Sequence, residues 1–452
     1  MADQIPYKEH ASKLMLLGGP LILSHLAQMA VTVTDTVMLG WYDVEALAAV
    51  TLMGTMSFVF FIVGSGFAFA VMPLVAAASE AGDDVQIRRT TRMGMWLSIL
   101  YFACVLPILL WSKTFLLMLG QEEVIATIAQ TYARIAAWGM LAQLLVMVLK
   151  SYLSAMEITR VVLWATIASA VLNAIVNYAL IFGNWGAPEL GVQGAAIASV
   201  GANAIALIYL TVYALRRLPQ HALFQRLWRP DWEAMATVYK LGWPIGLTNL
   251  AEVGLFAATT VMMGWIGTVA LAAHGIALQI ASITFMIHLG LSTAATVRAG
   301  RAAGRGNEVE LRRGGIVAVG LSAIAALLTV ALFLAVPEWL ISLFLDANDP
   351  QYPEIISVGV SLLIVAALFQ VADGAQVMAL GLLRGVQDTQ GPMFIAGLSY
   401  WAVGMTSSYV LGFILDFGAV GIWMGLVIGL GLAGVLMHLR FWRRSAKIGV
   451  AA

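Results

Sequence analysis

Residues 46–78, ALAAVTLMGTMSFVFFIVGSGFAFAVMPLVAAA, decide the fold, because no charged side chain occurs between Glu45 and Glu80. A helix of about 20 apolar residues crosses the ~30 Å hydrocarbon core of a bilayer. This segment is longer than that, so it spans the core even when the helix is tilted. The stretch therefore predicts a transmembrane helix.

Eleven further stretches are also long and mainly apolar, and Gly, Pro and charged residues mark their ends. Together the candidate spans cover residues 14–40, 46–78, 93–116, 124–150, 161–183, 190–215, 237–265, 270–297, 314–336, 355–383, 393–415 and 418–439. Composition agrees, because only 11% of the 452 residues are charged, against about 25% in ordinary soluble domains. The sequence therefore predicts an all-α polytopic membrane protein with twelve transmembrane helices. The first span is too long to be the core of a cleavable signal peptide.

The 24 Lys and Arg balance the 24 Asp and Glu, so the charge gives no indication of a nucleic-acid partner. The single Cys104 excludes a disulfide framework and a cysteine-based metal site. If the N-terminus is cytoplasmic, every Lys and Arg except Lys113 and Arg134 falls on the cytoplasmic side. Positive residues collect on that side of a membrane. We therefore expect a multi-pass protein of the cell inner (cytoplasmic) membrane with both termini cytoplasmic.

The two halves of the chain repeat one another when the sequence is shifted by 224 positions. The shift places Gly18-Gly-Pro20 on Gly242-Trp-Pro244, Met38-Leu-Gly-Trp41 on Met262-Met-Gly-Trp265, and Arg88-Arg89 on Arg312-Arg313. Because each half has six spans, both halves enter the membrane from the same side, as in the parallel repeats of some transporters. We expect a six-helix N-terminal lobe over 1–215, a cytoplasmic linker over 216–236, and a six-helix C-terminal lobe with a short tail over 237–452. A repeat without transport is the alternative, but alternating access requires two such lobes.

Three acids, Asp35, Glu252 and Asp373, fall inside the predicted spans. An ionised carboxylate at the bilayer centre costs about 2.5–3.5 kcal/mol on insertion scales. We assign every Lys and Arg to a loop or a span end, so we expect no cation to pair with these acids. They must then be protonated, bound to a cation or hydrated, which makes them candidate ion sites. A carboxyl hydrogen-bonded to a neighbouring carbonyl is the alternative for any one of them.

Polar residues surround each acid at helical spacing. Near Glu252 these are Thr248 and Asn249, with Phe256 one turn later; near Asp373 they are Gln370 and Gln376, with Phe369 one turn earlier. Oxygen donors of this kind bind a hard cation such as Na⁺. If the seventh and tenth spans meet, the two carboxyls also repel and can share a proton.

In the first half, Asn173 and Asn177 lie on one helix face and are candidates to meet Asp35. Hydrogen bonding that merely joins two helices is the alternative for this pair of amides. The repeat places Gln28 opposite Glu252, so the two lobes are chemically unequal.

Several of these motifs together resemble the multidrug and toxic compound extrusion (MATE) family and, within it, the NorM-type bacterial branch. They are Gly18-Gly-Pro20, Val33-Thr-Asp-Thr-Val-Met-Leu-Gly40, Leu172-Asn-Ala-Ile-Val-Asn-Tyr178, Asn249-Leu-Ala-Glu252 and Ala379-Leu-Gly-Leu-Leu-Arg-Gly-Val-Gln-Asp-Thr389. The resemblance implies a two-lobe exporter of lipophilic cationic drugs and dyes, driven by Na⁺ or H⁺, that confers antibiotic resistance. It also implies that Glu252 and Asp373 form a cation site in the second lobe, and that Asp35, Asn173 and Asn177 form the acidic and amide cluster of the first lobe. Phe369 stands where some members of the family have Tyr, so a phenolic oxygen is missing there.

We expect no cofactor other than the coupling cation. The expected partners of the protein are cationic substrates and the lipid bilayer, with no obligate protein partner evident. Gln28, Phe256 and Phe369 are candidates to line the substrate cavity. A flippase for lipid-linked sugars in a related superfamily is the alternative, but it would need basic cavity residues that we do not expect. An enzyme is disfavoured, because His25, His274 and His288 form no catalytic or metal-binding motif.

Overall fold

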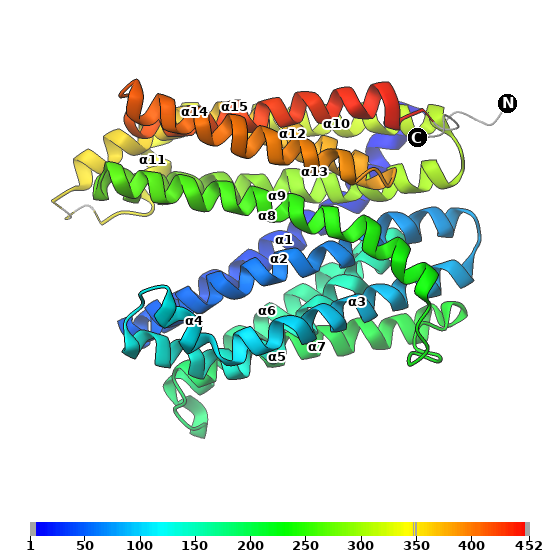
Figure 1. The fold of residues 1–452 in the computed structure, drawn as a ribbon, viewed down its shortest axis with the longest axis horizontal. Coiled ribbons are helices and arrows are strands. Elements are labelled where there is room, and N and C mark those ends of the chain that lie inside the picture. The colour runs from blue at the N-terminus through cyan, green and yellow to red at the C-terminus, as the bar shows by residue number, and fades with distance from the viewer. Residues whose placement is uncertain (1–5, 347, 349, 448–452) are drawn as a thin grey trace. The chain divides into compact units, whose positions relative to one another are not determined.

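The computed structural model describes residues 6–346, 348 and 350–447, and most of these residues are helical (Figure 1). In chain order the helices are α1 (Tyr7–Tyr42), α2 (Val44–Glu80), α3 (Asp84–Leu110), α4 (Ser112–Met118), α5 (Glu123–Ala155), α6 (Thr159–Phe182), η1 (Asn184–Gly186), α7 (Val192–Arg217), η2 (Pro219–His221), α8 (Trp232–Ile266), α9 (Thr268–Gly304), α10 (Glu308–Ala335), α11 (Pro337–Ser342), α12 (Tyr352–Gly385), α13 (Gln390–Ala396), η3 (Gly397–Met405), α14 (Thr406–Tyr409), η4 (Val410–Ile414), α15 (Gly418–Arg440) and η5 (Phe441–Ser445).

The predicted twelve-helix membrane architecture is confirmed. Among the described residues, eleven helices are long and apolar enough to cross a membrane, judged by length and composition. The remaining predicted span, residues 393–415, is built from α13, η3, α14 and η4 in succession. Its backbone stays helical at the joints, as at Gly397 (φ −55°, ψ −47°) and Thr406 (φ −61°, ψ −45°), but two stretches are π-helical. These wider turns interrupt the α-helix without ending the span.

The predicted third span, 93–116, ends too late. Helix α3 ends at Leu110, because Trp111 leaves the helical region (φ −106°, ψ 30°), and the separate short helix α4 follows. Apolar composition continues across this break, so hydropathy alone does not reveal it. The second half contains a matching short helix, α11, after its own third span.

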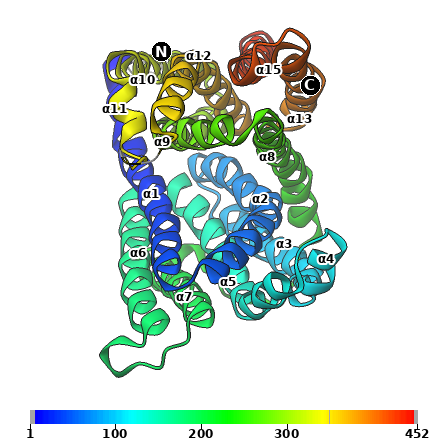
Figure 2. The ribbon, with the colours of Figure 1, turned by 90° about the vertical axis from the view of Figure 1, so that its left-hand side faces the viewer.

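Contacts between Cα atoms group the chain into two compact units. The first is Leu23–Gly246, in which α5 packs against α2, α3 and α7. The second comprises the residues up to Ile22 and those from Leu247 onward, in which α12 packs against α9, α10 and α15 (Figure 2). Because α5 and α12 are each the fourth spanning helix of their half, the repeat places equivalent helices in equivalent positions.

The units do not follow sequence order, since α1 changes unit after Ile22 and α8 changes unit after Gly246. These two positions are separated by 224 residues, which is the offset of the sequence repeat. Each unit therefore contains the opening part of a helix whose remainder belongs to the other unit. The lobes 1–215 and 237–452 were defined by the order of the spans along the chain, whereas these units are defined by contacts. The division into lobes stays a prediction.

Glycines make room for the two exchanged segments. A Cβ on Gly290 of α9 would lie 2.8 Å from the backbone nitrogen of Ile22, and one on Gly66 of α2 would lie 2.5 Å from that of Gly246. Gly66 and Gly290 are equivalent in the repeat. Small residues at such positions let two helix backbones approach closely.

The starts of the exchanged segments are also held in equivalent ways. Arg89 of α3 donates to Asp231, just before α8, over 2.5 and 3.1 Å. The hydrogen bond from Arg89 holds the pKa of Asp231 below its ordinary value. In the second unit the guanidinium of Arg313 lies 5.5 Å from the ring centroid of Tyr7, at the start of α1. Both pairs are related by the 224-residue offset, so the third helix of each half holds the first helix of the other half.

Candidate functional site

In the first unit the structure brings together the predicted acid and amides. The Nδ2 group of Asn177 donates to Asp35 Oδ1 over 2.5 Å and lies 3.1 Å from Asn173 Oδ1. Both asparagines are fully buried in α6, while Asp35 of α1 is half-buried. Asn173 Nδ2 and Asn177 Oδ1 have no hydrogen-bond partner among the described residues. The cluster therefore offers a carboxylate together with an unpaired amide oxygen.

Helices α1 and α6 are joined by a second polar contact, which fixes the position of this cluster. Ser24 Oγ lies 2.9 Å from Thr166 Oγ1. Thr166 donates its own proton to the carbonyl of Val162, so Ser24 is the donor between the two hydroxyls. Ser24 and Asp35 lie about three helical turns apart, which places both contacts on the same face of α1.

In the second unit Asp373 lies on α12 with a side chain only 2% exposed, and its Oδ1 has no hydrogen-bond partner in the described structure. Gln370 and Gln376 are fully buried about one turn to either side. Gln370 Nε2 donates to the carbonyl of Ala281 over 2.8 Å, and Gln376 Nε2 donates to the Tyr400 hydroxyl over 2.6 Å.

The orientation of these amides leaves oxygen atoms without a donor. A carbonyl can only accept a hydrogen bond, so the Gln370 nitrogen must face Ala281 and its Oε1 must point elsewhere. Oε1 of Gln370 and Oε1 of Gln376 both lack partners among the residues described. With Asp373 Oδ1 they make three buried, unpaired acceptors on one side of α12. Buried acceptors normally have a donor or a cation, so these oxygens are the strongest sign of a ligand site.

Close packing of α12 against α9 positions this oxygen-rich face. Ser292 Oγ donates to the carbonyl of Val377 over 2.7 Å, and Thr296 Oγ1 donates to that of Gly381 over 2.9 Å. A Cβ on Gly381 would lie 2.7 Å from the Ser292 carbonyl oxygen, so glycine is required at this crossing.

Helix α8 closes the site from another side, which confirms that the seventh and tenth spans meet. The rings of Phe256 on α8 and Phe369 on α12 are 6.0 Å apart and edge-to-face. The carboxyl of Glu252 on α8 is near enough to that of Asp373 to interact with it electrostatically. The predicted pair of acids therefore shares one polar region inside the second unit.

The expectation that no cation accompanies these acids is wrong. Arg384, in the last turn of α12, donates from Nη2 to Asn249 Oδ1 over 2.6 Å and interacts electrostatically with Glu252. Its side chain is half-buried and reaches α8 at Asn249, so the charge is not carried by the loop that follows α12. The spacing gives a signal for this, because Arg384 follows Asp373 by about three helical turns and lies on the same face.

Tyr400 is the site residue that sequence reasoning missed. It is fully buried in the π-helical stretch η3, and its hydroxyl accepts the hydrogen bond from Gln376, one turn after Asp373. A different helix thus supplies a phenol near the carboxyl groups where Phe369 lacks one. Nothing in the local sequence shows that this tyrosine turns toward α12.

The aromatic candidates differ in exposure. Phe369 is only 2% exposed and packs 5.4 Å from the Trp423 ring, whereas Phe256 is half-buried and Gln28, in the first unit, is exposed. Trp423 Nε1 donates to His274 Nδ1 over 3.1 Å. An indole only donates, so this nitrogen of His274 carries no proton. His274 is therefore a neutral packing residue behind Phe369.

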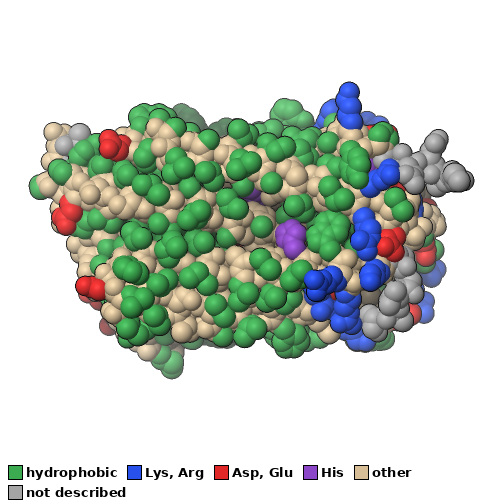
Figure 3. Space-filling model, turned by 90° about the horizontal axis from the view of Figure 1, so that it is seen from above, with side chains coloured by type: hydrophobic (Ala, Val, Ile, Leu, Met, Phe, Trp, Pro, Cys, Tyr) green, Lys and Arg blue, Asp and Glu red, His purple; other side chains and the backbone are tan. Residues whose placement is uncertain are grey.

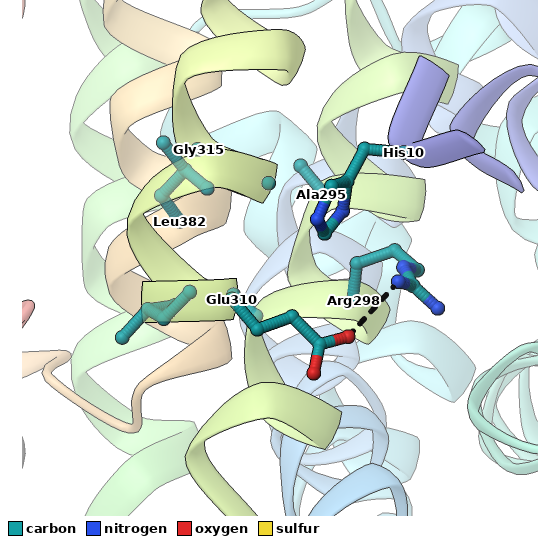
Figure 4. A pocket seen from close by; sticks show the side chains of 9 residues that line it. His10, Ala295, Arg298, Glu310, Gly315 and Leu382 are labelled. Atoms are coloured by element: carbon teal, nitrogen blue, oxygen red, sulfur yellow. Dashed lines mark hydrogen bonds and ion pairs between the residues drawn. The ribbon is translucent and has the colours of Figure 1, made fainter. Parts of the chain in front are cut away.

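A second polar cluster in this unit surrounds the start of α1 (Figure 4). His10, Arg298 and Glu310 line a cavity of about 10 Å³, room for about one water molecule. Glu310, whose side chain is 9% exposed, accepts from Arg298 over 3.2 Å and from Arg305 over 2.6 Å. The described residues contain no group of three or more His, Cys, Asp or Glu that could hold a metal ion, here or elsewhere. This cluster is best explained as a buried ion-pair network that stabilises the second unit.

Replacing Glu310 by Gln is expected to lower the free energy of unfolding by about 3 kcal/mol, because it removes the buried negative charge that two guanidinium groups contact. Chemical unfolding in detergent micelles measures the change. The matched control is Glu308→Gln, whose partner Arg312 is a neighbour on the same helix and whose side chain is 38% exposed, so about 0.5 kcal/mol is expected. Equal losses in the two variants would contradict this reading of the cluster.

Comparison with known proteins adds to this geometry. The family model MatE matches residues 20–179 and 244–410. A protein of Agrobacterium fabrum named "Probable multidrug resistance protein NorM" is 45% identical over 434 residues, which is 96% of this chain and 93% of that protein. A protein of the same name from Rhizobium meliloti is 43% identical, over 98% and 95% of the two chains.

Solved structures are similar in fold at low sequence identity. "Crystal structure of MATE in complex with MaL6" gives a TM-score of 0.89 at 18% identity, covering 98% of both chains. "Outward-facing conformation of a multidrug resistance MATE family transporter of the MOP superfamily" gives 0.86 at 18% identity, covering 98% of this chain and 97% of that one. At this identity the likeness concerns the fold alone.

Proposed function

Since this chain belongs to the MATE family of multidrug efflux transporters, and is a multi-pass membrane protein and not an enzyme, we propose that it works by secondary active antiport. In this proposal it exports lipophilic cationic drugs and dyes in exchange for Na⁺ or H⁺. The observation that carries the proposal is the buried Asp373, whose unpaired Oδ1 lies between two glutamines with unpaired oxygens. Such a set of oxygens suits a proton, an alkali cation or a cationic group of a drug.

The mechanism follows from competition between cations. An incoming Na⁺ or H⁺ neutralises Glu252 and Asp373 and so weakens their hold on a positively charged drug. Each tenfold ion gradient supplies about 1.4 kcal/mol, and each charge that crosses 100 mV supplies about 2.3 kcal/mol. Coupling also requires that the affinity for each cation differ between the two conformations of the transporter. Asp35, with Asn173 and Asn177, is proposed as a second cation site in the first unit.

Arg384 does not reverse this preference for cations. In the described structure Arg384 brings one positive charge to the second-unit site. Glu252 and Asp373 together bring up to two negative charges. Its side chain donates a hydrogen bond to Asn249 and its charge acts on Glu252, so it lowers the negative charge of the site without making it positive. A flippase for pyrophosphate-linked sugars would need a basic cavity, and these residues do not provide one.

We also propose that both termini are cytoplasmic. On the face drawn in Figure 3, Lys and Arg side chains gather at one end, and many hydrophobic side chains are spread over the remainder. In the first unit Arg92, at the start of α3, contacts the backbone of Gln225 and Arg226, so basic segments far apart in sequence meet at one end. Positive residues mark the cytoplasmic side of inner-membrane proteins.

The substrate class is tested by producing the protein in bacteria that lack their own drug exporters. Ethidium, a lipophilic cation, is expected to accumulate several-fold less in these cells than in cells with an empty vector. Fluorescein, an anionic dye of similar size, is expected to accumulate equally in both. Export of fluorescein but not of ethidium would contradict the proposal.

A further inference from the structure

An open cavity of about 500 Å³ lies in the first unit, away from the acidic clusters, between the start of α3 and the segment that precedes α8. Four arginines line it: Arg88, Arg92, Arg226 and Arg229. Arg88 and Arg92 are one helical turn apart on α3, and the other two come from the chain before α8. Like charges repel at this spacing, so such a cluster calls for an anion.

Acidic side chains of the described protein do not neutralise this cavity. Asp231 also lines it, but both of its carboxylate oxygens accept hydrogen bonds from Arg89. Arg89 also bonds Glu233 over 2.6 Å. No ion pair within the described residues engages the four arginines, and Arg92 Nε has no hydrogen-bond partner there. The cavity thus retains a strong positive charge.

The cavity wall is fixed in place by α3. Arg92 Nη1 donates to the carbonyls of Gln225 and Arg226 over 2.6 and 3.1 Å, and Trp96 Nε1 donates to that of Leu227 over 2.7 Å. Arg226 itself has a left-handed backbone with φ of 53°, which these contacts help to hold. The arginines therefore sit on a preorganised wall, which lowers the entropy cost of binding a ligand.

Two exposed tryptophans lie at or near the cavity. Trp232, which lines the cavity, is 72% exposed, and the nearby Trp228 is 77% exposed. Tryptophan is enriched where a membrane protein crosses the interface between lipid and water. An anion held here would be in contact with the membrane surface.

We propose that this cavity, which we call the arginine pocket, binds the phosphate headgroup of an anionic phospholipid. Guanidinium groups match phosphate oxygens with paired hydrogen bonds, and basic pockets beside transmembrane helices are suited to cardiolipin and related headgroups. The proposal does not depend on the drug or the coupling ion. Its role is to hold the segment before α8 at the membrane surface.

The test is retention of cardiolipin by the purified full-length protein, measured by native mass spectrometry after reconstitution in mixed phosphatidylcholine and cardiolipin. The triple variant Arg88→Gln, Arg226→Gln and Arg229→Gln keeps Arg92, which supports the wall. We expect its affinity for cardiolipin to fall about 100-fold, from a contribution of about fivefold per arginine. The control is the triple variant Arg216→Gln, Arg217→Gln and Arg443→Gln, which removes the same number of charges outside the pocket. We expect its affinity for cardiolipin to stay near that of the wild-type protein.

Equal loss in both triple variants, or loss in neither, overturns the proposal. If the pocket variant aggregates, the single variants Arg88→Gln and Arg229→Gln replace it, and each is expected to lose about fivefold. A second arm adds inorganic polyphosphate to the wild-type protein. Weak competition supports a lipid ligand, whereas displacement of cardiolipin at micromolar polyphosphate shows a site for soluble phosphate and overturns the assignment.

Discussion

Replacing Asp373 by Asn is expected to abolish ethidium export, with the rate falling at least about tenfold, to the background of cells without the protein. Asparagine has nearly the same shape, but it carries no negative charge and cannot exchange a proton. Because Asp373 Oδ1 has no partner in the described structure, the substitution breaks no hydrogen bond seen at that atom. Folding should therefore survive, and the effect should fall on transport alone.

The measurement is ethidium efflux from energised cells, with the amount of membrane-inserted protein quantified in parallel. A matched control is Asp346→Asn, which changes an exposed acid in the loop after α11 and should leave efflux unchanged. Normal efflux by the Asp373 variant would remove this carboxyl from the mechanism.

The second large effect is expected from Gly66→Ala. The added Cβ would lie 2.5 Å from the Gly246 nitrogen and 2.8 Å from its Cα, so backbone meets backbone and no side chain can rotate away. We expect the free energy of unfolding to fall by about 3 kcal/mol, as in strongly overpacked interiors. Unfolding in detergent micelles, followed by circular dichroism, provides the measurement.

Gly54→Ala on the same helix is the matched control, because its Cβ would have nothing within 4 Å. Alanine is also the better helix former there, by about 1 kcal/mol. Gly290 is the equivalent of Gly66 in the repeat, and its Cβ would lie 2.8 Å from the backbone nitrogen of Ile22. We therefore expect Gly290→Ala to lower the free energy of unfolding by a similar amount. If both variants were as stable as the Gly54 control, α1 and α8 would not pack as described.

Local sequence was enough to predict the twelve spans, because each depends on a run of apolar residues. The meeting of Asp35 with Asn173 and Asn177 was also predictable, since helical spacing placed both amides on one face and a buried acid needs donors. The 224-residue offset of the sequence repeat also separates Ile22 from Gly246, the positions after which α1 and α8 change unit.

Other contacts between distant helices could not be predicted, because no local pattern marks them. Arg384 directly follows the predicted span 355–383, and only the hydrogen bond to Asn249 shows where its side chain points. Tyr400 reaches the carboxyl region through π-helical turns that composition does not encode. The exchange of helix segments between units depends on the fit of Gly66 and Gly290 to two backbones, which one sequence does not show.

Exchange of one cation for another at Glu252 and Asp373 can be measured as ethidium uptake into inverted membrane vesicles. A Na⁺ gradient and a pH gradient are imposed in separate experiments, each with and without an ionophore that dissipates it. If the carboxyls exchange cations in this way, at least one gradient drives accumulation of the dye, and this accumulation is lost when the gradient is dissipated and in Asp373→Asn. Accumulation that is independent of both gradients, or that persists in the variant, would contradict this exchange.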